Sequence, residues 1–223
     1  MNKKIFHLSP LALLALTACG GGGGGGSSGG GGGSSSGSSS SGGSGSSRSS
    51  SHSILGKVIK GPLTNALVFL DYNDNGTFDA GETSVRTASD GSYTLSSSQA
   101  SVSIVALTDD TTIDNSSGSV LTGVTLRAPS GASVVSPNTT LMKEAGLTAA
   151  EVGEVLGLSA DIDITTFNPY ATGVDAAKAL AVEKVSQQIM TTISTFAAVT
   201  EGSGASAADS FSTALASVVE VVQ

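Results

Sequence analysis

Residues 56–95 read GKVIKGPLTNALVFLDYNDNGTFDAGETSVRTASDGSYTL, and this stretch decides the fold that we expect. A short apolar run at 66–70 is followed by a loop rich in side-chain oxygens and then by a strand-like segment at 83–87. Short apolar runs bounded by glycine, proline, asparagine and aspartate are typical of β-strands. The Asp90–Gly91 pair predicts a hairpin turn before a strand at 92–95, because glycine tolerates the positive φ that tight turns need.

The loop after the first of these strands carries an oxygen-bearing side chain at every second position. Its spacing matches the calcium loops in which alternate side chains and one backbone carbonyl converge on the ion. The candidate metal ligands, at positions 1, 3, 5, 7, 9 and 12 of that pattern, are Asp71, Asn73, Asn75, Thr77, Asp79 and Glu82. Gly76 stands at position 6, where such a loop turns sharply. We therefore predict a Ca²⁺ site; the alternative is a polar loop whose side chains only satisfy nearby backbone groups.

Two features of this loop limit the affinity that we expect. The flanking segments are strand-like, so the loop lacks the two helices of an EF-hand. Asparagine stands at positions 3 and 5, which leaves Asp71, Asp79 and Glu82 as the carboxylate ligands. Extracellular calcium modules bind at about 10⁻⁴–10⁻³ M, and we expect that range here. Asp74, at position 4, is expected to point away from the ion.

Short strands continue before the pattern becomes helical. Further strands are predicted at 54–59, 101–107 and 120–126, and several short strands at close spacing favour a small antiparallel β-sandwich. We therefore assign residues 54–130 to a β-sandwich and residues 131–223 to a helical region, which makes the fold class α+β. Asp161 and Asp163 flank Ile162, so we expect the two acids to face water.

The helical region carries clear start signals and apolar stripes. Ser136 before Pro137 predicts one helix start, Thr148 with Glu151 predicts a capping box, and Asp175 can cap a long helix. Apolar residues three and four apart define the buried face of a helix. The stripe predicted for the long helix is Val182, Val185, Ile189, Ile193 and Phe196, and that of a last helix from about residue 207 is Phe211, Leu215, Val218 and Val222.

Residues 56–95 resemble the calcium-binding B-type repeats of bacterial surface adhesins and the related carboxypeptidase regulatory-like domains. The shared features are the D-x-N-x-N-G-x-x-D-x-x-E loop between two strands and the D-G-x-Y that precedes the next strand. The resemblance implies a transthyretin-like β-sandwich in which the ion rigidifies a loop and the module serves as a spacer or adhesive stalk. This chain carries one copy rather than a tandem array. VVSPNTTLM and ADIDITTFNPY, at 134–142 and 160–170, resemble a region that follows such modules in large marine bacterial surface proteins.

The N-terminus has the features of a lipoprotein signal. Lys3 and Lys4 precede a short apolar segment, and residues 16–19 read LTAC. This resembles the lipobox of bacterial lipoproteins, which implies a signal peptide at 1–18 and lipidation of Cys19; the alternative is an ordinary signal peptide with an incidental cysteine. Gly20, rather than aspartate, follows the cysteine, which by the same resemblance suggests the outer membrane. Residues 19–53 are almost entirely glycine and serine after the cysteine, and we expect a disordered tether.

The composition limits the possible functions. The net charge is −8 with few aromatic residues, which argues against nucleic acid as a partner. The only histidines are His7 and His52 and the only cysteine is Cys19, so the part expected to fold lacks the side chains of Ser-His-Asp, Cys-His and ordinary zinc sites. We expect a non-enzymatic, lipid-anchored surface protein with a structural or adhesive role. The alternatives are a carbohydrate- or protein-binding adhesin module with an extracellular ligand, or an accessory or truncated part of a larger envelope protein.

Overall fold

The computed structural model describes residues 51–99 and 101–223. The expected signal peptide, Cys19 and most of the expected tether lie outside the described residues. The end of that tether was placed too late by the sequence prediction. His52 and Ser53 already belong to strand β1 (His52–Val58), where they pair with Ser97 and Ser96. Small polar residues can therefore extend this strand, because a neighbouring strand satisfies their backbone groups.

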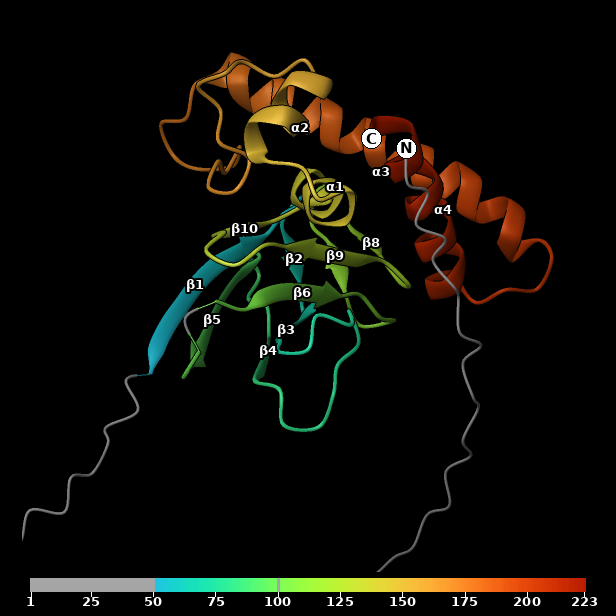
Figure 1. Ribbon diagram of the computed structural model, residues 1–223, viewed down its shortest axis with the longest axis horizontal. Coiled ribbons are helices and arrows are strands. Elements are labelled where there is room, and N and C mark those ends of the chain that lie inside the picture. The colour runs from blue at the N-terminus through green and yellow to red at the C-terminus, as the bar shows by residue number, and fades with distance from the viewer. Residues whose placement is uncertain (1–50, 100) are drawn as a thin grey trace, which may run out of the picture. The chain divides into compact units, whose positions relative to one another are not determined.

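The architecture is α+β, with three sheets and four helices in the described residues (Figure 1). One sheet has the order β10-β1-β5, with β5 at Ser92–Ser97 and β10 at Val134–Val135. The second has the order β4-β3-β6-β9, with bounds Ser84–Arg86, Leu67–Asp71, Ser103–Leu107 and Thr125–Ala128. A small third sheet contains β2 (Leu63–Thr64), β7 (Ile113–Asp114) and β8 (Ser119–Val120). All pairs are antiparallel except β1 with β10, which is parallel.

The Asp90–Gly91 turn exists, but the hairpin predicted around it is wrong. Gly91 has φ +77°, as a tight turn requires, and the Ala88 N–H donates to the Ser92 carbonyl at 2.9 Å. However, β4 pairs with β3, whereas β5 pairs with β1 in the other sheet. The short β4 could offer β5 few partners, while β1 pairs with β5 along its length from Ser97 to Ser92. The turn therefore carries the chain from one sheet to the other.

The predicted helix starts are confirmed. The helices are α1 (Pro137–Ala145), α2 (Ala149–Val155), α3 (Ala176–Glu201) and α4 (Ala207–Val222). Ser136 and Thr148 cap α1 and α2 through reciprocal capping boxes, and the Asp175 side chain accepts from the Lys178 N–H at the start of α3. These caps satisfy backbone N–H groups that have no partner within the helix.

The predicted apolar stripe of α3 is correct in its first part and wrong at Phe196. Val182, Ile189 and Ile193 are buried and Val185 is half-buried, whereas Phe196 is 53% exposed and Ala197 is buried in its place. A strict seven-residue repeat drifts by about 20° per heptad around a straight α-helix, so the buried face moves to the next residue. On α4 the predicted Phe211 and Leu215 are buried, while the predicted Val218 and Val222 are half-buried.

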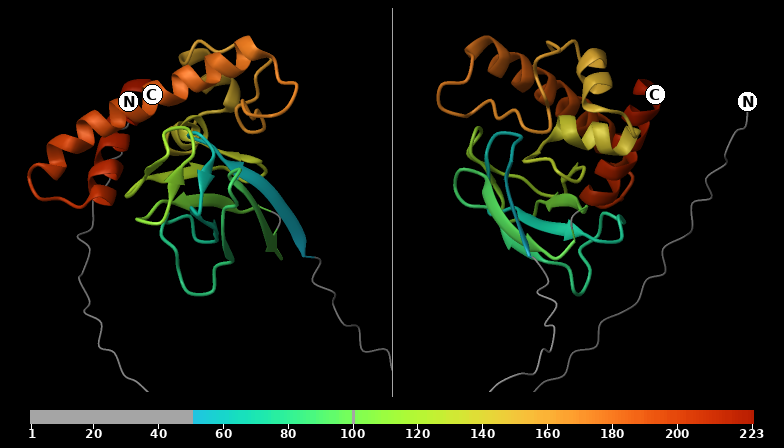
Figure 2. Two further views of the ribbon diagram at one scale, coloured as in Figure 1. Left: turned by 180° about the vertical axis from the view of Figure 1, so that it is seen from behind. Right: turned by 60° about the vertical axis from the view of Figure 1, so that its left-hand side comes forward.

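The sheets and the helices share one hydrophobic core. Helix α1 packs on β9 and also contacts α3 and α4 (Figures 1 and 2). Leu126 of β9, Leu141 of α1 and Ile193 of α3 belong to the same buried cluster. Because β10 lies beyond residue 130 and pairs with β1, the boundary expected at 130 falls inside this shared core. Ile162 is buried between the exposed Asp161 and Asp163, as predicted.

Candidate calcium-binding loop

The candidate loop connects β3 to β4, so the prediction of strands on both sides is confirmed. Asp71 is the last residue of β3, where it pairs with Ser103 of β6 and is 2% exposed. Gly76 has φ +75°, in the left-handed region that glycine adopts most easily, and Asp74 shares it with φ +60°. The glycine at position 6 is thus used for the sharp turn that the motif requires.

Three of the predicted ligands meet at one point. The side-chain amides of Asn73 and Asn75 each donate a hydrogen bond to Oδ2 of Asp79, at 2.9 and 2.7 Å. The hydrogen bond from Asn73, and then that from Asn75, lowers the pKa of the Asp79 carboxyl. Positions 3, 5 and 9 of the motif therefore converge on a carboxylate that remains ionised at neutral pH.

The other predicted ligands adjoin this group through backbone hydrogen bonds. Asp71 accepts from the N–H groups of Asn75 and Gly76, at 3.0 and 2.7 Å. Glu82 accepts from the N–H groups of Tyr72 and Asp79, at 3.0 and 2.9 Å. The N–H of the exposed Thr77 donates to Oδ1 of Asn75. The two terminal carboxylates thus tie the ends of the loop to its interior.

In this conformation the carboxylates do not form a metal cage. Within residues 51–99 and 101–223, no three histidine, cysteine, aspartate or glutamate side chains gather closely enough to hold a metal ion. The amide nitrogens of Asn73 and Asn75, rather than their oxygens, face Asp79. A half-turn of each amide group exchanges its nitrogen and oxygen, so the same side chains can present oxygens. The donor set is therefore suited in ligand type to Ca²⁺, which prefers oxygens, and the loop is held here by its own hydrogen bonds.

Three charged residues next to the loop were not identified from the sequence. Arg127 of β9 places Nη2 3.1 Å from Oδ2 of Asp71 and 3.1 Å from Oδ1 of Asp74, and Nη1 lies 2.9 Å from Oε1 of Glu144. Lys143 places Nζ 2.7 Å from Oδ2 of Asp74. The one available signal was an arginine within the short strand TLRA, whose neighbours Leu126 and Ala128 are buried. No local sequence pattern connects Arg127 with Asp71, which lies far from it along the chain.

Asp74 forms ion pairs with Arg127 of β9 and with Lys143 of helix α1. Burial acts to raise the pKa of its carboxyl, but the hydrogen bond from Lys143 and the nearby positive charges outweigh that effect and lower it. Asp74 is thus an ionised link between the loop and α1, and the loop is attached to the body of the protein on this side.

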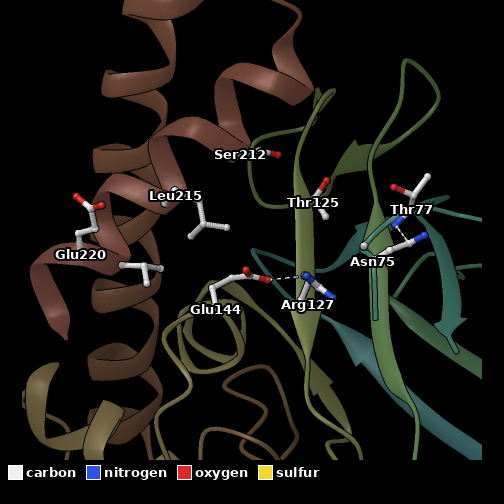
Figure 3. Close-up of a pocket in the computed structure, with 11 residues that line it drawn as sticks. Asn75, Thr77, Thr125, Arg127, Glu144, Ser212, Leu215 and Glu220 are labelled. Carbon is white, nitrogen blue, oxygen red and sulfur yellow. Dashed lines mark hydrogen bonds and ion pairs between the residues drawn. The ribbon is translucent and has the colours of Figure 1, made fainter. Parts of the chain in front are cut away.

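A cavity of about 430 Å³ lies beside the loop (Figure 3). Asn75 and Thr77 border it on one side, Leu215 and Glu220 of α4 border it on the other, and Arg127 lies between them. The side chain of Glu144 reaches Arg127 across the base of this cavity. The loop, β9, α1 and α4 therefore meet at one place.

Two aromatic side chains, Phe78 of the loop and Tyr93 of β5, pack against the body of the protein. The ring of Phe78 lies 5.4 Å from that of the buried Phe69, centroid to centroid and tilted by 59°. Tyr93 is buried on β5.

In the described part of the chain, no helix is both long and apolar enough to cross a membrane. Comparisons of the chain with protein-family models, with curated proteins and with solved structures found no significant match.

Proposed function

We propose that this chain is a non-catalytic, lipid-anchored cell-surface protein whose sheets are stabilised by Ca²⁺ bound in the loop at 71–82. The observation that carries the proposal is the convergence of Asn73 and Asn75 on Asp79, around a glycine in the left-handed conformation. A loop with this spacing and an oxygen donor set is the arrangement that hard cations select. The two larger sheets, by the resemblance stated above, would form a transthyretin-like sandwich.

The ion would act by compensating charge. Asp71, Asn73, Asn75, Thr77, Asp79 and Glu82 would hold it. Three of these residues are carboxylates, which would repel one another if they were drawn together without the ion. Bound Ca²⁺ supplies the positive charge that holds the three together, and this would fasten the end of β3 to the start of β4. The role is structural or adhesive, as a spacer or a support for an extracellular contact.

The anchor in this proposal is the Cys19 thiol, which lies outside the described residues. Lipidation there would hold the protein in the outer membrane, and the glycine- and serine-rich segment would separate the folded part from the lipid. Cys19→Ser should move the protein from the membrane fraction to the soluble fraction of the producing cells. If the variant stays in the membrane fraction to the same extent as the wild type, the anchor is elsewhere.

Thermal unfolding with and without Ca²⁺ tests the metal site. A ligand that binds only the native state raises stability by mass action, so the unfolding midpoint of the full chain should rise with millimolar CaCl₂ and fall back with EDTA. MgCl₂ at the same concentration serves as the control, because Mg²⁺ gives up its waters reluctantly. A midpoint that does not respond to Ca²⁺, together with no heat in a calorimetric titration, would contradict the proposal.

A further inference from the structure

Arg127 occupies the position of an internal counter-ion to the candidate metal site. Its side chain is 14% exposed, and the Asp71 side chain that it contacts is fully buried. The same guanidinium group also binds Asp74 and Glu144. A buried carboxylate needs a compensating charge, and in this conformation Arg127 supplies it.

Arg127 and a cation would compete for the charge of one carboxylate. Asp71 stands at position 1 of the loop, and Arg127 already neutralises it from the side of β9. A divalent ion bound to Asp71 would lie close to the fixed positive charge of the guanidinium group, and the two would repel each other. The repulsion lowers the affinity of the loop for the ion.

We propose that Arg127 sets the calcium affinity of the loop and couples the loop to helix α1 through Glu144; this inference rests on the proposed function. Metal binding weakens the Asp71–Arg127 pair and leaves the guanidinium group to Glu144 and Asp74. Coupling between two sites is reciprocal, so a change at Glu144 alters metal affinity just as the metal alters the contact with α1.

Two substitutions should shift calcium affinity in opposite directions. Arg127→Gln removes the competing charge, so the dissociation constant for Ca²⁺ should fall roughly tenfold, the scale of one partly screened charge interaction. Glu144→Gln removes the other carboxylate that pairs with Arg127, so the ion pair between Arg127 and Asp71 becomes stronger. The dissociation constant for Ca²⁺ should then rise about threefold. Arg127→Lys keeps the charge and should bind Ca²⁺ as the wild type does.

The measurement is calorimetric titration of CaCl₂ into the full chain, purified in detergent. Arg86→Gln is the matched control, because Arg86 lies in the same sheet and pairs with Asp109 at 2.6 Å, far from the loop in the register of the strands. Glu144→Gln keeps the inference testable if Arg127→Gln does not fold without metal, because the Glu144 side chain is 29% exposed and its removal leaves Asp71 paired.

The outcomes separate this inference from the calcium site itself. Wild-type affinity in both Arg127→Gln and Glu144→Gln would overturn the role of Arg127 and leave the calcium site in place. No heat from the wild type or from either variant would overturn both proposals. Binding that appears only in Arg127→Gln would overturn the calcium proposal for the natural chain and support the competition between Arg127 and the ion.

Discussion

The Val58 N–H donates a hydrogen bond to the carbonyl oxygen of Gly91 at 2.9 Å, which ties the end of β1 to the turn that leads into β5. Gly91 is buried and has φ +77°. A Cβ atom at this position would lie 2.6 Å from the Val58 carbonyl oxygen, a backbone atom that cannot move aside. The crossing between the two larger sheets therefore depends on the absence of a side chain at residue 91.

Gly91→Ala should destabilise the fold by more than about 3 kcal/mol, because strain at positive φ adds to a backbone clash. Gly118→Ala is the matched control, since Gly118 has φ +69° but open space around its missing Cβ. The control should lose only about 1–2 kcal/mol. Urea denaturation followed by circular dichroism measures both values, and equal losses would show that the clash has no effect.

Thr87 fixes the chain before this turn through its side chain. The buried Thr87 hydroxyl donates to the Leu63 carbonyl at 2.6 Å and accepts from the Ala66 N–H at 2.9 Å. Thr87→Val keeps the shape and leaves both backbone groups unsatisfied, so the free energy of unfolding should fall by about 1–3 kcal/mol. Thr94→Val on the exposed face of β5 should change it by less than about 0.5 kcal/mol. A loss at Thr94 as large as that at Thr87 would contradict this interpretation.

The pair of Lys60 and Asp114 should make stability depend on pH. Lys60 Nζ lies 2.7 Å from Oδ2 of Asp114, whose side chain is 3% exposed. Burial acts to raise the pKa of Asp114, but the hydrogen bond from Lys60 and that from the Ser116 N–H outweigh it and lower this pKa below its ordinary value. The ionised Asp114 carboxylate therefore contributes its full share to stability above its pKa in the unfolded chain, about 3.9. This stabilisation is lost as the pH falls through the lower pKa of Asp114 in the folded state.

Asp114→Asn should accordingly destabilise the protein near neutral pH, by about 3 kcal/mol, and the difference from the wild type should shrink as the pH falls below about 4. Urea titrations at a series of pH values measure this convergence. The exposed Asp110→Asn serves as the control and should change stability little at neutral pH. A difference between Asp114→Asn and the wild type that stays constant with pH would exclude this carboxylate as the source.

Calcium stabilisation should require the loop carboxylates. At a Ca²⁺ concentration of about 100 times the dissociation constant, mass action contributes about 2.7 kcal/mol, which corresponds to a midpoint increase of roughly 5–10 °C for a protein of this size. Asp79→Asn and Glu82→Gln should lose most of this increase, whereas Asp110→Asn should keep it. Asp79 and Glu82 suit the test better than Asp71, because their removal leaves no buried arginine without its partner. An increase that persists in both variants would place the ion elsewhere.

Local chemistry explains which elements the sequence predicted well. The helix caps at Ser136, Thr148 and Asp175 depend on side-chain contacts with residues three positions away, so each one can be identified from a few adjacent letters. The left-handed conformation of Gly76 follows in the same way from the spacing of the loop. The convergence of Asn73 and Asn75 on Asp79 is also local, because alternate side chains in a tight loop turn toward one centre.

Local sequence patterns did not predict which strands pair or which charged residues form ion pairs across the fold. The sequence marks the turn at Gly91 but does not show that β5 pairs with β1 rather than β4. It also does not show that Arg127 lies against Asp71. These properties depend on which surface faces each segment, and segments far apart in the sequence provide that surface.

The sequence by itself determined the strands on either side of the loop, the capped helices and the oxygen-rich loop, because each depends on contacts within a few residues, whereas the single strand predicted at 120–126 is wrong: Ser119–Val120 and Thr125–Ala128 belong to different sheets. Tertiary structure decided that residues 131–223 share a core and a sheet with the strands, and that Arg127 lies against Asp71. A charge buried in a fold is compensated by whichever residue the packing brings to it. Only the assembled chain shows which residue that is.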